Sequence, residues 1–502
     1  MSKKFLTGAL RFQDLKRLRH TRFMPIFLSL LAVFFVSFDL TSSAQRAPQQ
    51  SAATTSAARN AALIAATAEV LKETSEIRQL SILRPVQSSA QSRPEIERTL
   101  IKNLDEDMTA TQAHASEVTL RKLGLAPDDF QYRALMIRLL TEQVAGYYDP
   151  KMQQFHLADW IDLDGQKPIM AHELTHALQD QHFNLRRFEH WPKGDSDAEL
   201  AAHALIEGDA TLAMALYIAN NPLRPLAFLK SLGSTRLPSE ELDKAPRALR
   251  ETLLFPYQDG EKWVFILYKQ GGWDRVSKAF TELPQSTEQI LHPEKYFAHE
   301  PPVRVTLPDI APLLDRSSSS EIRGRRSEVG QDLRTPRPPA WKRLDSDVNG
   351  EWGFYLILDQ FLKSPAESRR AAEGWGGDRF ALYEGPRGEA MLVSLSVWDT
   401  ESDAREFFDA YVKRTELRYP DARSIEPAVN AQSPLFSKSF LTSQGVVSMD
   451  VRGARVLVLE GVPPGKDVKG LKATLWMSSQ ADPFEENTFS SPGVHAWENG
   501  AV

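Results

Sequence analysis

Residues 167–183 read KPIMAHELTHALQDQHF, and this stretch decides the fold expected around it. Apolar side chains recur along it at the spacing of one helix face, and polar side chains fall on the opposite side. The apolar set is Met170, Leu174, Ala177 and Leu178, and the polar set is His172, Glu173, His176 and Asp180. No Gly or Pro interrupts the run from Ile169 to Phe183. The stretch therefore predicts an unbroken amphipathic helix.

Two histidines four residues apart stand on the polar side of this helix, in the run His-Glu-Leu-Thr-His at residues 172–176. Residues four apart lie one turn apart on the same face, so His172 and His176 can direct ring nitrogens at a single Zn²⁺ ion. Glu173 lies beside them and can take a proton from a zinc-activated water. The motif predicts a catalytic site with Zn²⁺ as cofactor and Glu173 as general base.

The third zinc ligand is expected on a second helix. A catalytic zinc takes three protein ligands, and the chain contains no Cys that could serve as one. Residues 197–220 (DAELAAHALIEGDATLAMALYIAN) predict a long, Ala-rich, buried helix. A carboxylate inside such a helix is costly unless it is paired or bound to a metal. Glu207 is therefore the predicted third ligand, after His172 and His176.

Glu199 and His203 form a row with Glu207 at intervals of four residues, which drifts only about 40° per step around the helix. They are lesser candidates for the metal site. His203 would then support a ligand or contact a substrate, although a satisfied structural histidine is the favoured interpretation.

The motif resembles the zincin metallopeptidases, in which this helix supplies two zinc ligands and the general base. The resemblance is plausible over about residues 130–300. It implies a gluzincin-like domain, because gluzincins take their third ligand from a Glu on a downstream helix, the role that Glu207 fits. Many gluzincins carry an Asp four residues later, where this chain has Thr211, so the resemblance assigns no acid to support the zinc-binding histidines. The runs HELTHALQDQHF and ALIEGDAT also resemble uncharacterised bacterial proteins.

The resemblance also suggests an alternative third zinc ligand and candidates for the residue that supports the oxyanion. In metzincins a histidine at the position of His182 is the third ligand, but that pattern needs a Gly where Gln179 stands. Gln179 favours continued helix, which puts His182 about 240° around from His176. Zincins often use a Tyr or His to support the oxyanion, and the candidates here are Tyr257 and His292.

The first 44 residues have the pattern of an export signal. Basic residues precede an apolar run at residues 23–38 (FMPIFLSLLAVFFVSF), and Ser42-Ser43-Ala44 offers a cleavage site. We therefore expect a secreted or periplasmic protein, with an uncleaved N-terminal membrane anchor as the alternative. Residues 45–59 predict a low-complexity linker, and residues 45–125 could act as a prosegment.

Charge and motifs limit the partners. Residues 1–44 hold seven Lys/Arg and two Asp/Glu, so removing them changes the net charge from −6 to −11. An acidic chain argues against a nucleic-acid partner. The sequence contains no phosphate-binding loop motif, so no nucleotide is expected as a partner. A peptide or protein substrate is the expected partner.

The expected fold class is α+β, in two domains. Residues 60–302 predict a mainly helical, zincin-like catalytic domain with a small edge sheet, in which residues 146–150 form a turn and residues 153–160 the strand before the motif helix. A Ser/Arg/Pro-rich linker (303–340), an α+β accessory domain (341–480) and a tail (481–502) are expected to follow.

These features predict an exported zinc metallopeptidase. Two alternatives stay open. One is a zinc hydrolase of a non-peptide amide, from the cell wall or a lipid. The other is a binding or assembly protein whose zincin fold is no longer catalytic.

Overall fold

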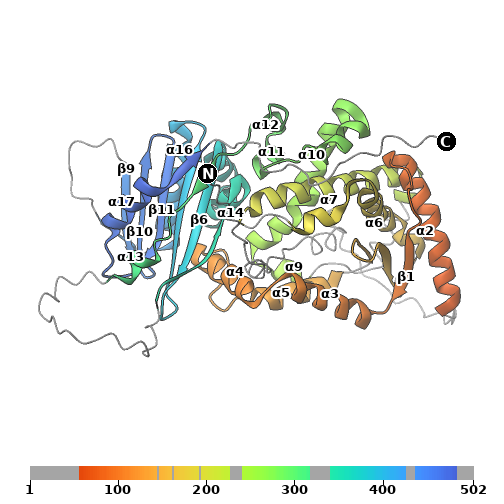
Figure 1. Ribbon diagram of the computed structural model, residues 1–502, viewed down its shortest axis with the longest axis horizontal. Helices are drawn as coiled ribbons and strands as arrows, with labels where there is room; N and C mark the ends of the chain where they lie inside the picture. The colour runs from red at the N-terminus through yellow and green to blue at the C-terminus, as the bar shows by residue number, and fades with distance from the viewer. Residues whose placement is uncertain are drawn as a thin grey trace, which may run out of the picture.

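The protein is an α+β molecule with a helical part and a sheet part side by side along its long axis (Figure 1). The computed structural model describes residues 56–143, 146–160, 163–190, 194–225, 240–316, 340–425 and 436–482. The expected export signal lies outside the described residues. Within them, no helix is both long and apolar enough to cross a membrane.

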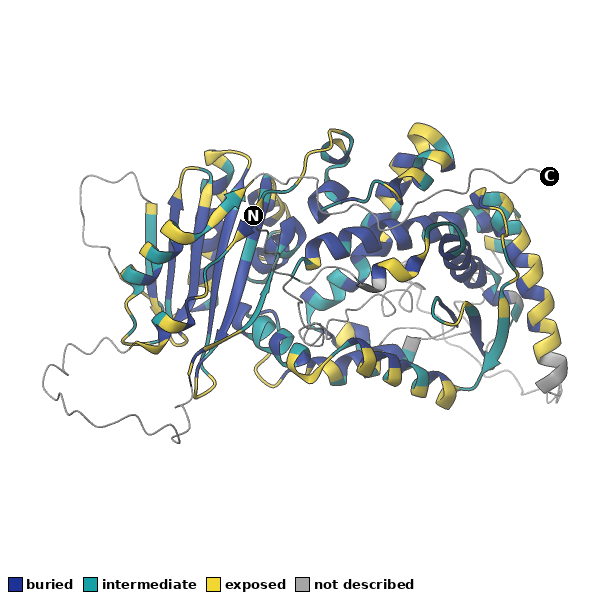
Figure 2. Ribbon diagram, viewed as in Figure 1, coloured by how far each residue is buried: buried dark blue, intermediate teal, exposed yellow. Residues whose placement is uncertain are grey.

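Four helices form the centre of the helical part. They are α2 (Ser56–Arg78), α6 (Leu163–Phe183), α7 (Ser196–Ala219) and α10 (Arg247–Ala279). Helix α7 packs against α6, α10 and α2, and α2 also covers α6. Figure 2 shows that α7 is buried along nearly its whole length, whereas α2 exposes its outer face. The Ala-rich sequence of α7 permits this close packing on several sides, because small side chains let neighbouring helices approach.

The crossing of α7 and α10 depends on two glycines. A Cβ atom added at Gly260 would lie 2.3 Å from the carbonyl oxygen of Ala204, and one added at Gly208 would lie 2.3 Å from the backbone of Gly260. The two backbones are therefore in direct contact beside Glu207, and neither glycine position has room for a side chain.

A three-stranded sheet lies next to α6, in the order β1 (Gln87–Gln91), β3 (Gln154–Ala158), β2 (Gly146–Asp149). Strand β3 runs parallel to β1 and antiparallel to β2. Residues 146–150, expected as a turn, thus contribute an edge strand, and the strand expected at 153–160 lies in the middle of the sheet.

Shorter helices complete this part and connect it to the sheet part. They are α3 (Arg93–Asp107), α4 (Ala110–Leu123), α5 (Tyr132–Gln143), η2 (Leu185–His190), α9 (Glu240–Lys244), α11 (Thr287–Leu291) and α12 (Pro293–Phe297). Local sequence defines α4 well: Thr109 and Gln112 form a capping box at its start, and Gly124 ends it with φ 73°.

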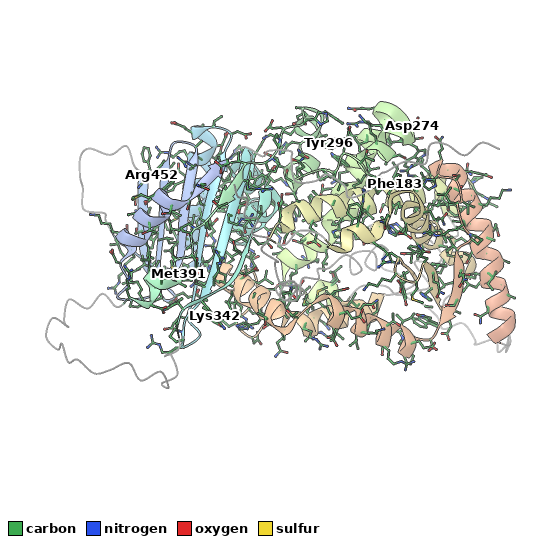
Figure 3. The ribbon with its side chains drawn as sticks, viewed as in Figure 1. Phe183, Asp274, Tyr296, Lys342, Met391 and Arg452 are labelled. Atoms are coloured by element: carbon green, nitrogen blue, oxygen red, sulfur yellow. The ribbon has the colours of Figure 1, made fainter. Side chains whose placement is uncertain are left out.

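The sheet part contains a seven-stranded antiparallel sheet. Its order is β5 (Lys342–Asp347), β6 (Trp375–Glu384), β7 (Ala390–Trp398), β11 (Arg455–Val462), β10 (Gly445–Arg452), β9 (Phe436–Thr442) and β8 (Arg423–Ile425). Helices α14 (Gly350–Leu362), α15 (Pro365–Ala372) and α16 (Glu401–Arg418) cover one face. Helices α13 (Ala311–Asp315) and α17 (Val468–Ser478) cover the other. Figure 3 shows Met391 and Arg452 on this sheet and Phe183 in the helical part.

The alternation of side chains explains how one sheet serves two cores. Ala381, Val393 and Leu459 are register neighbours on β6, β7 and β11, and they face α13 and α17. Leu382 and Leu392 point to the opposite face and join a core that also includes side chains of α7, α10, α14 and α16. The two parts therefore share one hydrophobic core.

Two domain boundaries differ from those expected. Strand β4 (Arg304–Thr306) pairs with β12 (Gln480–Asp482), and α13 packs under the sheet. Residues 304–315, assigned to a linker by composition, thus belong to the sheet part, and so do the first residues of the expected tail. Residues 317–339 of that linker lie outside the described residues.

Candidate metal centre

Helices α6 and α7 bring three donor atoms together. Nε2 of His172 lies 3.2 Å from Oε2 of Glu207, Nε2 of His176 lies 3.3 Å from the same oxygen, and the two nitrogens are 3.1 Å apart. Among the described residues, no other group of three His, Asp or Glu side chains converges in this way. The three side chains are buried to 2% exposure or less.

This triangle fits a zinc ion. Ligands about 2.05 Å from a tetrahedral zinc lie about 3.3 Å from one another, close to the three separations observed. Two imidazoles and one carboxylate are a donor set that zinc accepts at catalytic sites. The second oxygen of Glu207 and Oε1 of Glu173 are buried without a hydrogen-bond partner, which is expected where an ion and its water complete a site.

Glu173 lies between the histidines and the small sheet. Its Oε2 accepts a hydrogen bond of 3.1 Å from the backbone N–H of Tyr148 on the edge strand β2. Burial raises the pKa of Glu173 to about 8. The edge strand therefore fixes the carboxylate that the sequence assigns as general base.

The ligands carry complementary charges in the absence of metal. Burial acts to raise the pKa of Glu207, but the adjacent His176 and His172 outweigh it and hold the pKa below its usual value. Burial acts to lower the pKa of His176, and Glu207 overcomes this and raises it to about 9. Burial lowers the pKa of His172. A metal ion must therefore compete with a proton on His176.

A chain of hydrogen bonds supports His176 from behind. Its Nδ1 lies 2.8 Å from Oε1 of Gln179, and Nε2 of Gln179 donates to Oδ2 of Asp209 at 2.9 Å. Nε of Arg78, on α2, donates to Oδ1 of Asp209 at 2.5 Å, and both of these side chains are fully buried. Asp209 thus supplies the supporting acid that could not be assigned from the sequence, and it acts through Gln179 rather than on a ligand directly.

Helix α6 is buried around the motif. Every residue from 171 to 180 is buried, on the polar side as well as on the apolar side. The polar side faces α7 and β2, where the motif side chains find their partners. An all-round buried helix with this many polar groups is itself a sign that those groups are bonded to one another.

The other candidates lie elsewhere or nearby. His182 is turned away from the site and lies with Nε2 2.7 Å from the carbonyl oxygen of Ser81. His292 pairs with Glu351 at 2.9 Å, where the helical and sheet parts meet. The ring of Tyr257 on α10 lies 6.2 Å from the ring of His172, so Tyr257 is the nearer of the two oxyanion candidates.

His203 and Glu199 lie on the buried face of α7. Neither ring nitrogen of His203 has a hydrogen-bond partner, and neither does Oε1 of Glu199. Burial lowers the pKa of His203 to about 4 and raises that of Glu199 to about 8. The backbone of Glu199 also interacts with the ring and acts to raise the pKa of His203. The interpretation of His203 as a satisfied structural histidine therefore stays a prediction.

Comparisons with known proteins cover the sheet part alone. A domain of unknown function (DUF8575) matches residues 338–472. These residues begin just before β5 and end within α17. No curated protein and no solved structure matches the chain.

Proposed function

We propose that this chain is an exported zinc-dependent metallopeptidase, with His172, His176 and Glu207 as zinc ligands and Glu173 as general base. The observation that carries the proposal is the triangle of donor atoms, 3.1–3.3 Å on each side, with a buried carboxylate beside it. Three protein ligands leave one position for water, as catalytic zinc sites do.

Each residue has a defined task in this proposal. Bound zinc supplies Lewis acidity, which lowers the pKa of water and polarises a carbonyl group. Glu173, held by the Tyr148 N–H, takes the proton of the attacking water and passes it to the leaving amine. Gln179 holds the ring of His176, and Tyr257, the oxyanion candidate nearer to the ligands, is assigned to contact the attacked carbonyl group.

A second candidate is a non-catalytic zinc protein, and one observation favours it. The three ligand side chains and Glu173 are exposed by 2% or less, so a substrate reaches them only after neighbouring groups move. Enzymes that close over a substrate bury their sites similarly, and enclosure excludes water from the reaction.

The test compares wild type with Glu173→Gln after zinc loading. We expect one zinc per chain in both, hydrolysis of unstructured proteins by wild type, and at least about a hundredfold loss in the variant, because general-base catalysis contributes that much. Full activity in Glu173→Gln would exclude the mechanism.

Two further measurements assign the ligand and the substrate class. Glu207→Ala should lower zinc content, and His182→Ala should leave it unchanged. Turnover of cell-wall or lipid amides without turnover of peptides would favour the non-peptide hydrolase. Stoichiometric zinc without turnover of any substrate would favour the non-catalytic protein.

A further inference from the structure

One face of α7 carries a strip of polar groups that the metal does not explain. Glu199, His203, Glu207 and Thr211 are spaced four residues apart, and each has a buried side-chain atom without a hydrogen-bond partner. The helix around them is built mostly of Ala and Leu and is packed in the core. An unsatisfied buried polar group costs about 1–3 kcal/mol, so such a strip calls for a polar occupant.

The zinc ion and its water account for one position of the strip. They would satisfy Glu207 and the adjacent Glu173. With a rise of 1.5 Å per residue, His203 lies about 6 Å and Glu199 about 12 Å further along the axis of α7. Among the described residues, the donor atoms that converge within 4.8 Å of one another belong to His172, His176 and Glu207, so neither His203 nor Glu199 is part of that group.

The chemistry of the two groups differs. His203 is neutral near pH 7, because burial lowers its pKa to about 4, so its ring offers one N–H donor and one nitrogen acceptor. A peptide group presents one carbonyl acceptor and one N–H donor, and it is complementary to such a ring. Glu199 has the carboxylates of Asp347 and Asp195 close enough to raise its pKa in addition to burial. That region favours a positively charged group.

On the premise of the proposed peptidase function, we propose that Glu199 and His203 form a substrate-binding strip on α7. His203 binds a peptide group about two residues from the scissile bond, since an extended chain advances about 3.4 Å per residue. Glu199 binds a positive charge about three or four residues away, from a basic side chain or a free amino terminus. The substrate class is therefore a peptide with a cationic group at a fixed distance from the cleavage site.

The test uses the zinc-loaded full chain and pairs of peptides that carry Lys or norleucine at one position and are otherwise identical. The position of the exchange varies along the series, and each peptide is made with a free and with an acetylated amino terminus. Glu199→Gln should lower the ratio of kcat/KM for Lys over norleucine about tenfold at one position, while the norleucine peptide changes little. If the acetylated peptides alone lose affinity, the charge comes from the amino terminus. As a control, Asp274→Asn removes a charge from the exposed side of α10 (Figure 3). It should leave the ratio of kcat/KM for Lys over norleucine unchanged for the free and the acetylated peptides.

His203 is tested by two replacements. His203→Leu should raise KM about tenfold for all peptides and leave kcat within about threefold, because substrate binding is lost and the zinc is not. His203→Gln retains a donor and an acceptor and should recover most of the loss. Equal losses with Leu and Gln would indicate packing and overturn the assignment, as would an unchanged KM. An unchanged Lys preference in Glu199→Gln would overturn the cationic subsite.

Binding measurements separate this inference from the proposed function. Calorimetry with zinc-loaded Glu173→Gln reports peptide affinity without turnover. If wild type cleaves no peptide but Lys peptides bind and Glu199→Gln abolishes the preference, the peptidase proposal fails and the strip stands. Cleavage without any Lys preference leaves the peptidase and overturns the strip. Absence of both cleavage and binding overturns both.

Discussion

Gln179 holds a zinc-binding histidine in position. Its side-chain oxygen accepts from His176 and its amide donates to Asp209, so the ring orientation of His176 depends on one amide. We predict that Gln179→Leu lowers zinc affinity about 10- to 100-fold, the usual effect of losing such a support. A competition titration against a chelator of known affinity measures the change.

Gln181 provides the matched control for this prediction. It lies on the same helix but binds the backbone of Leu83 and Arg84, away from the metal centre. Gln181→Leu should keep the zinc affinity of wild type. Equal affinities for wild type and Gln179→Leu would show that the amide does not support the ligand.

The site illustrates which residues a sequence can reveal. His172, Glu173 and His176 follow from helical spacing, and Glu207 follows from the cost of a carboxylate in an apolar helix. The support of His176 was out of reach, because Asp209 and Arg78 are separated by 131 residues. A polar Gln179 within the buried stretch 171–180 of α6 was the one available signal.

At the scale of the element, the α7–α10 crossing leaves no room for a side chain at Gly260. We predict that Gly260→Ala lowers the free energy of unfolding by about 3 kcal/mol. Ala favours helix over Gly by about 1 kcal/mol, but a Cβ 2.3 Å from the Ala204 carbonyl oxygen outweighs that gain. Denaturant unfolding measures the difference. Gly353→Ala on α14, where the nearest atom is a side-chain carbon at 3.3 Å, should change stability by less than about 1 kcal/mol.

The start of α7 predicts a pH dependence. Asp195 caps the helix by accepting from the Ala198 N–H at 3.1 Å, and burial together with Asp347 raises the pKa of Asp195 to about 6. An unfolded Asp titrates near 3.9, so ionising Asp195 favours the unfolded state, and stability falls as pH rises from about 4 through about 6. Asn caps equally well without a charge. Asp195→Asn should therefore be more stable than wild type by about 1 kcal/mol at pH 8, since solvent screens this partly exposed side chain.

The comparison must be repeated at low pH. Below about pH 3, Asp195 is protonated in both states, and the advantage of Asp195→Asn should vanish. Asp467 caps α17 by accepting from the Gly470 N–H, so Asp467→Asn makes the same exchange at the cap of another helix and is measured beside it. A difference between wild type and Asp195→Asn that does not change with pH would contradict the raised pKa.

Elements differed in how well local sequence specified them. The motif helix has clear periodicity and appears near the expected residues. Helix α16 is locally specified by a capping box between Thr400 and Asp403. Strand β2 was missed because Gly146 and the Asp149-Pro150 pair are turn signals. It is a strand because β3 pairs with it and Glu173 binds its free edge.

At the scale of the whole molecule, the helical and sheet parts are not independent. Side chains from α7 and α10 share one core with α14 and α16. The backbone N–H and the hydroxyl of Thr287, on α11, donate to Asp197 at the start of α7. The backbone N–H of Trp352, on α14, donates to the Thr287 hydroxyl. Composition placed a domain boundary at the Ser/Arg/Pro-rich run but carried no information on this packing. The sheet part thus packs against and stabilises the helix that carries Glu207.

The contacts of the N-terminal helix α2 bear on whether residues 45–125 act as a removable prosegment. Arg78 reaches the metal centre through Asp209, and α2 side chains including Leu63 and Val70 pack with those of α6 in one cluster. Removing Arg78 leaves a buried carboxylate unpaired, at a cost of about 3–5 kcal/mol. We therefore predict that a chain beginning at residue 93 loses stoichiometric zinc and melts at a lower temperature than a chain beginning at residue 45. A chain beginning at residue 56 should keep the zinc content and the melting temperature of the chain beginning at residue 45. Zinc content and thermal unfolding of the three purified chains measure this. If the chain beginning at residue 93 bound one zinc and were more active than the others, α2 would be a removable prosegment rather than part of the site.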